Sequence, residues 1–244
     1  MNAWPDGYAR YVLDTVDSTL SEASRRLPTV AGPTWILALE QTAARGRRGR
    51  AWATPRGNFA GTLILRRRED PGVAALRSFV ASLALYRTFA ATTGQASAFA
   101  LKWPNDVLLH GGKVAGILLE STGDHLIIGI GVNLLHAPDP DQVEPGALRP
   151  MSLSRDLGAD VDPEVFLNVL ASEYARLEDQ FITHGFAPIR RAWLDQAARL
   201  GEVITARTMN DSFTGTFEDV DEAGNLILRT AEGAQAITAA EVFF

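Results

Sequence analysis

The segment LKWPNDVLLHGGKVAGILLE, residues 101–120, decides more about the fold than any other part of the sequence. Its proline predicts that 101–109 is an interrupted strand or an edge strand, because proline cannot donate a backbone hydrogen bond to a neighbouring strand. Gly111-Gly112 predicts a hairpin turn, after which 113–120 returns as a second strand. Lys113 begins this otherwise almost wholly apolar strand, so its side chain is a candidate to point into a pocket. The plainer alternative is a hairpin whose polar residues face water.

The segments around this hairpin predict further strands and several helices. Asp17-Ser18-Thr19 is typical of a helix N-terminus, with Thr19 and Glu22 as a capping box. Asp162-Pro163 predicts the start of a long helix, because proline is well tolerated at the first helical position. Strands are expected at 11–16, 34–39, 59–65 and 126–135, and helices at 73–93, from 162 to 185, and at 186–198.

The pattern changes after Gly201. Short β-type runs follow one another at 202–207, 213–219, 225–229 and 235–238. Several short strands with turns between them are typical of a small barrel. The sequence therefore predicts two domains, residues 1–197 and 198–244.

The composition is that of an ordinary globular protein, and it excludes several classes of function. The chain has 244 residues, 46% of them hydrophobic, and a formal net charge of −6. Without cysteine it has no disulfide framework, no thiolate metal site and no cysteine nucleophile. The four histidines show no metal-ligand spacing. No apolar run is expected to approach the roughly 18 residues that span a bilayer, and the N-terminal residues do not resemble a signal peptide.

The segment ARGRRGRAW, residues 44–52, concentrates four arginines and two glycines in an acidic chain. Glycine lets backbone N–H groups approach a ligand closely, and arginine donates bidentate hydrogen bonds to carboxylate or phosphate. The segment matches neither of the standard phosphate-binding patterns. A pI near 5.3 argues against general nucleic-acid binding. We therefore interpret the segment as a local site for a small anionic ligand, the alternative being a solvated basic turn.

Two other segments could also contact a ligand. In GIGVN, residues 129–133, the glycines Gly129 and Gly131 either allow close packing of a neighbour or let a ligand lie against the backbone, with Asn133 as a polar edge. The helix N-terminus at Asp17-Ser18-Thr19 offers free N–H donors in addition to its cap.

Taken in order along the chain, these motifs resemble those of the biotin protein ligases. The resemblance is strong over residues 11–135 and weaker through Trp193 to the C-terminal strands. It implies an α+β fold, a mixed β-sheet with flanking helices like that of class II aminoacyl-tRNA synthetases and lipoyl ligases, followed by a small SH3-like barrel. Some relatives carry an N-terminal DNA-binding domain. About ten residues precede the first expected strand here, so we expect the form without that domain.

The resemblance also implies roles for individual residues. Catalysis would involve Lys113, Arg47 and Arg45. Biotin would be contacted by Ser18, Thr19, Gln41, Arg45, Gly46, Arg47, Lys113, Gly116 and Gly129. ATP would be contacted by Arg48, Arg50, Trp52, Asn105, Asp106 and Asn133. Two residues depart from the family pattern, since Ala44 replaces a usual glycine and Leu20 replaces a common asparagine.

The activity implied is a two-step ligation. Biotin would be activated with ATP and Mg²⁺ to biotinyl-5′-AMP and then transferred to a lysine of a biotin carboxyl carrier protein. We expect a cytoplasmic monomer or homodimer that binds neither nucleic acid nor membrane, with Mg²⁺ ligands that the sequence leaves unassigned. Two alternatives stay open at this point. One is a lipoate–protein ligase, and the other is a non-catalytic module whose arginine segment contacts nucleic acid.

Overall fold

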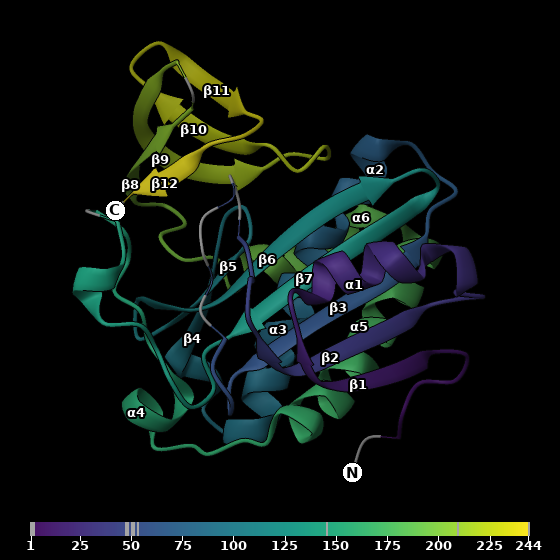
Figure 1. Ribbon diagram of the computed structural model, residues 1–244. Coiled ribbons are helices and arrows are strands. Elements are labelled where there is room, and N and C mark those ends of the chain that lie inside the picture. Colours follow the sequence, from purple (N-terminus) through teal and green to yellow (C-terminus); the bar gives the residue numbers. More distant parts are fainter. Residues whose placement is uncertain are drawn as a thin grey trace.

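The strands of the protein form two separate sheets (Figure 1). The computed structural model describes residues 3–46, 49, 52, 54–144, 146–208 and 210–243. The seven-stranded sheet has the order β1-β2-β3-β7-β6-β5-β4, and the five-stranded sheet has the order β11-β10-β9-β8-β12. The larger sheet consists of β1 (Ala9–Val16), β2 (Thr34–Gln41), β3 (Phe59–Arg66), β4 (Phe99–Lys102), β5 (Asp106–Leu109), β6 (Gly112–Thr122) and β7 (His125–Val132). The smaller sheet consists of β8 (Val203–Arg207), β9 (Ser212–Val220), β10 (Leu226–Thr230), β11 (Gly233–Ile237) and β12 (Glu241–Phe243).

Helices cover both faces of the larger sheet. The α-helices are α1 (Thr19–Arg26), α2 (Pro71–Ala75), α3 (Arg77–Thr93), α4 (Leu153–Leu157), α5 (Pro163–His184) and α6 (Phe186–Leu194), with 3₁₀ turns η1 (Leu27–Thr29), η3 (Ala96–Ala98) and η4 (Pro140–Gln142). Strands β1 and β2 run parallel, whereas the other neighbouring pairs of this sheet are antiparallel. The mixed sheet, its helices and the antiparallel C-terminal sheet confirm the predicted α+β class.

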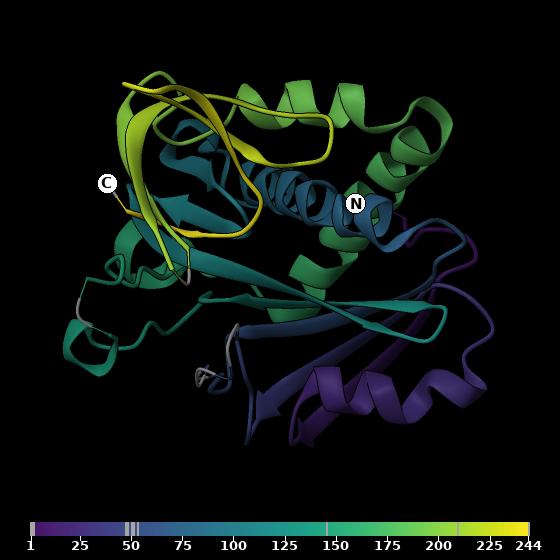
Figure 2. The same cartoon turned by 90° about the horizontal axis from the view of Figure 1, so that it is seen from above.

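Alternation along the central strands explains the two helical layers. Trp35 and Leu37 of β2 belong to the large core cluster, whereas Ile36 between them belongs to a second cluster on the opposite face. Leu63 and Ile64 of β3 divide in the same way. Since successive strand residues point to opposite faces, apolar residues at every position require a cover on both sides. Helix α1 covers one face, and α3 and α5 cover the other (Figure 2).

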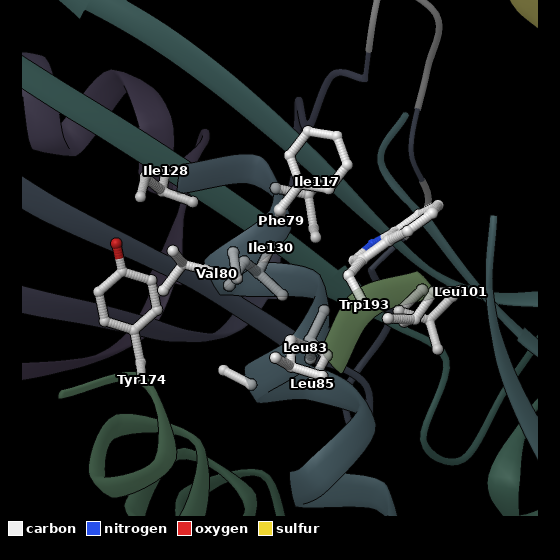
Figure 3. Packing of buried hydrophobic residues seen from close by; sticks show 14 of the residues in the cluster. Phe79, Val80, Leu83, Leu85, Leu101, Ile117, Ile128, Ile130, Tyr174 and Trp193 are labelled. Atoms are coloured by element: carbon white, nitrogen blue, oxygen red, sulfur yellow. The ribbon is translucent and has the colours of Figure 1, made fainter. Parts of the chain in front are cut away.

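The core lies mainly between the sheet and helices α3, α5 and α6. Figure 3 shows the side chains that meet there, among them Phe79, Val80, Leu83 and Leu85 of α3, Ile128 and Ile130 of β7, Tyr174 of α5 and Trp193 of α6. The Trp193 indole donates from Nε1 to Ser82 Oγ at 3.0 Å, so its one polar atom is satisfied although the ring is buried.

One charged cluster is buried in this layer. The Arg77 guanidinium lies 2.7 Å from Glu178 Oε1, and it also pairs with Glu69. The Tyr174 hydroxyl donates to Glu178 Oε2 at 3.2 Å, and burial raises the pKa of Tyr174 well above its usual value. Because an isolated buried charge is expensive, each member of this cluster depends on the others.

The segment predicted as one helix at 73–93 is divided between α2 and α3. Gly94 ends α3 in the left-handed conformation, as the glycine predicted. The stretch Pro71–Thr93 has the length and composition of a helix that could cross a membrane, although polar residues such as Arg77 and Arg87 interrupt its apolar runs. In that stretch 67% of the most apolar 18-residue window is buried inside the protein, so core packing accounts for its apolar character. Helix α6 also ends at Leu194, earlier than the expected 198.

The segment 101–109, expected to be an interrupted strand or an edge strand, forms two short antiparallel strands, and β4 is the outermost strand of the sheet. Residues 103–105 connect them, with a cis peptide bond between Trp103 and Pro104. The connection is held from two sides, since Ser78 Oγ donates to the Pro104 carbonyl at 3.1 Å and Trp103 Nε1 donates to the Gly224 carbonyl at 3.0 Å. The turn at Gly224, between β9 and β10, therefore joins the smaller sheet to this hairpin.

Candidate active site

A cavity of about 740 Å³ lies where the two sheets meet. It is bordered by the start of α1, the end of β2, parts of β5, β6 and β7, residues within 138–144 and 146–150, and β12. Within the part of the chain that the structure describes, every residue to which the family resemblance assigns a role lines it: Ser18, Thr19, Gln41, Arg45, Gly46, Trp52, Asn105, Asp106, Lys113, Gly116, Gly129 and Asn133. Arg47, Arg48 and Arg50 lie outside the described residues. Residues remote in sequence are thus brought to one place, while their individual roles stay predictions.

A pair of glycines forms a flat floor beneath Trp52. Gly116 of β6 and Gly131 of β7 are direct partners in the sheet register. A Cβ atom on Gly131 would lie 2.6 Å from Trp52 Cε2, and one on Gly116 would lie 3.6 Å from Trp52 Cζ3. The indole therefore rests against the backbone of Gly131, where any side chain would collide with it, whereas the distance at Gly116 is that of an ordinary van der Waals contact. The Lys113 ammonium lies 5.5 Å from the centre of the Trp52 ring, within the range of a cation–π contact.

The third glycine, Gly129, is covered by Leu20. A Cβ on Gly129 would lie 2.8 Å from Leu20 Cδ2. The close approach predicted for GIGVN is confirmed, but side chains of this chain lie against Gly129 and Gly131. Leu20 also packs with Ile36 and Ile127. Leu20, which departs from the family pattern, thus forms part of an apolar wall and makes no polar contact through its side chain.

Two lysines share one carboxylate in the cavity. Lys113 Nζ lies 2.7 Å from Asp106 Oδ1, and Lys102 Nζ lies 3.9 Å from Asp106 Oδ2. Lys102 is only 6% exposed. The prediction that Lys113 points into a pocket is confirmed. Lys102 was not singled out, although it adjoins the Trp103-Pro104-Asn105-Asp106 motif.

A chain of hydrogen bonds connects the start of α1 to the end of β2. Gln41 Oε1 accepts from the Thr19 backbone N–H at 2.7 Å and from Thr19 Oγ1 at 3.0 Å. Gln41 Nε2 donates to Thr54 Oγ1 at 3.0 Å. Behind Thr19, the fully buried Thr62 donates to Thr19 Oγ1 at 2.8 Å. Thr62 was missed, yet one hydroxyl within the buried run FAGTLIL of β3 is a signal that could have found it.

The predicted capping box at the start of α1 was wrong. Ser18 occupies the cap position without a capping side-chain bond, and Thr19 turns instead towards Gln41. Glu22 accepts from Arg25 Nε at 2.8 Å rather than reaching back to the cap. Arg25 also donates to Asp17, and this hydrogen bonding lowers the pKa of Asp17 to about 2. Tertiary partners have thus replaced the local cap.

Comparison with known proteins identifies the family to which this site belongs. Residues 12–133 match the model of the biotin/lipoate A/B protein ligase family, and residues 200–244 match that of the biotin protein ligase C-terminal domain. The chain is 55% identical over 238 residues to the biotin–[acetyl-CoA-carboxylase] ligase of Paracoccus denitrificans, covering 96% of this chain and 99% of that protein. The chain belongs to the biotin protein ligases.

Two further proteins of the family match most of this chain at lower sequence identity. The bifunctional ligase/repressor BirA of Bacillus spizizenii is 34% identical over 218 residues, which cover 86% of this chain but 65% of that protein. The structure of the biotin protein ligase from Aquifex aeolicus in complex with biotin and ATP is 27% identical, with a TM-score of 0.83 over 96% of this chain and 97% of that one. The resemblance inferred from the sequence motifs is therefore confirmed.

In this ligase the arginine segment is anchored at both ends. Arg45 donates from Nη2 to both carboxylate oxygens of Glu120, at 3.0 Å each, and from Nη1 to Ser21 Oγ at 3.2 Å. The Trp52 backbone N–H donates to the Ala44 carbonyl at 3.1 Å and closes the base of the segment. The Arg45 guanidinium is thus hydrogen-bonded to Glu120, although Arg45 borders the cavity.

The two asparagines of the ligase site hold backbone in place. Asn105 Nδ2 donates to the Ile117 carbonyl, which ties the β4–β5 connection to β6. Asn133 Nδ2 donates to the Met151 carbonyl at 3.0 Å, which ties the end of β7 to the start of α4. Both amides therefore shape the cavity wall.

Two walls of the cavity were not predicted. One comes from residues 138–144 and 146–150, and the other is 240–243, which includes β12 of the smaller sheet. Among the described residues no group of three or more His, Cys, Asp or Glu could hold a metal ion.

Proposed function

We propose that this chain is a biotin–[acetyl-CoA-carboxylase] ligase that activates biotin as biotinyl-5′-AMP and then transfers it to a lysine of a biotin carboxyl carrier protein. The observation that carries the proposal is the Lys113–Asp106 pair beside Trp52, inside a cavity that gathers the described motif residues. The name of the Paracoccus relative and the biotin and ATP bound to the Aquifex ligase support it.

Biotin is placed at the α1 end of the cavity. Ser18, Thr19 and Gln41 supply polar groups there, suited to a ureido ring that both donates and accepts hydrogen bonds. Leu20 supplies an apolar wall for the rest of the bicycle. The biotin carboxylate then points towards Lys113, past Gly116 and Gly129.

ATP is placed on the side of Trp52, Asn105 and Asn133, with Arg48 and Arg50 nearer its phosphates. In the first step the biotin carboxylate attacks the α-phosphorus, a P–O bond forms, and the bond to pyrophosphate breaks. Because two anions approach each other, fixed positive charge lowers the barrier. Lys113 supplies it, together with Arg47. Arg45 acts through its place at the base of the arginine segment, since its guanidinium is bound to Glu120.

Mg²⁺ is proposed to arrive on the phosphates of ATP, where it neutralises charge. This ion commonly keeps its waters and binds through one or two carboxylates together with substrate phosphates. The described residues offer no cluster of three acidic or histidine ligands, and Asp106 is already shared by two lysines.

In the second step the amine of the acceptor lysine attacks the acyl carbon. A C–N bond forms, the C–O bond to AMP breaks, and the amine loses a proton. Asp106 is the carboxylate beside Lys113 and is proposed to accept that proton. The arginine segment is proposed to cover the intermediate and exclude water until the acceptor binds. An Arg47→Gly variant is then expected to release the adenylate faster.

Other features of the enzyme are proposed with the family. The larger sheet and its helices are class II aminoacyl-tRNA synthetase-like, and the smaller sheet is an SH3-like barrel. The boundary is placed between residues 197 and 198. The enzyme is proposed to act in the cytoplasm as a monomer or homodimer.

Transfer of biotin to a purified carrier domain tests the proposal. The protein is incubated with biotin, ATP and Mg²⁺, and the product is detected by a streptavidin gel shift. An ATP-dependent shift that is lost in Lys113→Ala is expected, and a parallel reaction with lipoate in place of biotin should leave the carrier unmodified. A folded protein that modifies the carrier only with lipoate would contradict the assignment to biotin.

A further inference from the structure

The chain uses lysine at only two positions. It has 23 lysine and arginine residues, and the lysines are Lys102 and Lys113 alone. Both line the cavity. Lysine carries a compact, flexible point charge, whereas arginine carries a broad planar one, so the two are not interchangeable in a confined site. All the remaining residues of this set are arginines, and lysine stands only at the two positions beside Asp106.

The two lysines differ in freedom. Lys102 is the register partner of Asp106 across β4 and β5, and its side chain is 7% exposed. Lys113 comes from β6, and its side chain is 32% exposed. Asp106 presents one oxygen to each of them. Lys102 is therefore the fixed, buried partner, and Lys113 is the partner with room to move.

Movement of Lys113 towards a ligand has a consequence for Asp106. The Asp106 side chain is only 15% exposed, and a carboxylate of this kind is costly to leave without a partner. With Lys102 in place, the carboxylate keeps a cation when Lys113 leaves. With a neutral residue at position 102, Asp106 would hold Lys113 more tightly.

We propose that Lys102 is a positioning residue that keeps Asp106 paired while Lys113 moves from Asp106 to the reacting phosphate. The proposal rests on the proposed function, because it assigns Lys102 to the adenylation step. It concerns the availability of Lys113 and not the binding of biotin. Removal of Lys102 therefore lowers kcat of adenylation and leaves the KM for biotin unchanged.

The single-turnover burst of pyrophosphate release in the absence of an acceptor protein measures this step. Lys102→Met is expected to lower the rate constant of the burst about tenfold, the size of coupling found between charged residues in contact. In an Asp106→Asn background, where no carboxylate needs a partner, Lys102→Met is expected to cause no further loss. If the two changes instead multiply, Lys102 does not act through Asp106 and the proposal is overturned. Lys102→Gln, which keeps a polar side chain, is expected to behave as Lys102→Met.

Amine labelling provides a readout that needs no turnover. Because the chain has two lysines, acetylation by an anhydride can be assigned to Lys113 by mass spectrometry, with the α-amino group as internal reference. Lys102→Met is expected to slow labelling of Lys113 several-fold. Arg56→Met removes an exposed cation from Asp14 and is the matched control, expected to change neither readout. Unchanged labelling of Lys113 in Lys102→Met would overturn the proposal. A parent protein that releases no pyrophosphate would instead refute the proposed function, and labelling would still decide whether Lys102 frees Lys113.

Discussion

Replacing Thr62 by valine is expected to weaken biotin binding by about five- to tenfold without affecting ATP. Thr62 is fully buried and donates to Thr19 Oγ1 at 2.8 Å, and Thr19 donates to Gln41 Oε1 at 3.0 Å. Valine keeps the branched shape but removes the hydroxyl, so the Thr19 hydroxyl is free to rotate away from Gln41. One such hydrogen bond contributes about 1–1.5 kcal/mol net. With about 1.4 kcal/mol for each factor of ten, this loss gives the stated change in Kd.

Isothermal titration of biotin into the parent protein, Thr62→Val and Thr62→Ser measures this change. Serine retains the hydroxyl and is expected to restore most of the affinity. ATP titration is the internal control, and thermal unfolding checks that each variant is folded. A biotin Kd for Thr62→Val within about twofold of the parent would refute the orienting role of Thr62, as would an equal change in the Kd for ATP.

Three other changes test the site and the core. Gly131→Ala places a Cβ 2.6 Å from Trp52 Cε2, so the indole should leave the strand and its fluorescence emission should shift to the red; an unchanged spectrum would contradict this packing. Glu178→Gln removes one carboxylate from the buried Arg77, while that of Glu69 remains. The free energy of unfolding measured in urea should fall by about 3 kcal/mol, and a loss under about 1 kcal/mol would contradict the role of this network. The pKa of Asp17 is lowered to about 2 by the hydrogen bonds it accepts, so its contribution to stability is present above its ordinary value of 3.8 and lost as the pH falls towards 2. Asp17→Asn should therefore flatten the dependence of Tm on pH between about 4 and 2, and equal slopes for variant and parent would show that Asp17 does not contribute.

Features set by local pattern could be predicted from the sequence. The strand at 34–39, the glycine that ends α3 and the interruption within 101–109 each follow from residue types within a few positions. The described motif residues of the candidate site were predicted too, because the motifs occur in a recognisable order. The apolar residues after Lys113 predicted that its side chain points into a pocket, and Lys113 lines the cavity.

Features set by distant partners could not be predicted. The capping box failed because Gln41, which follows Thr19 by 22 positions, offered Thr19 a better acceptor. Glu120 binds Arg45 across 75 positions, and no local motif announces it. The walls at 138–144 and 146–150 and at 240–243 likewise have no signature of their own, since they border the cavity only in the folded chain.

Because both lysines line the cavity, few amines of this chain are open to acylation by an adenylate that leaves it. An acyl adenylate reacts with free amines, and it does not acylate arginine, which stays protonated at neutral pH. Every other cationic side chain of this protein is an arginine or a histidine. Under the proposed mechanism, acylation of this chain's own lysines is therefore restricted to Lys102 and Lys113 in the cavity. An adenylate that escapes from the cavity would find the α-amino group as the remaining aliphatic amine of this chain, and would find further lysines on other proteins.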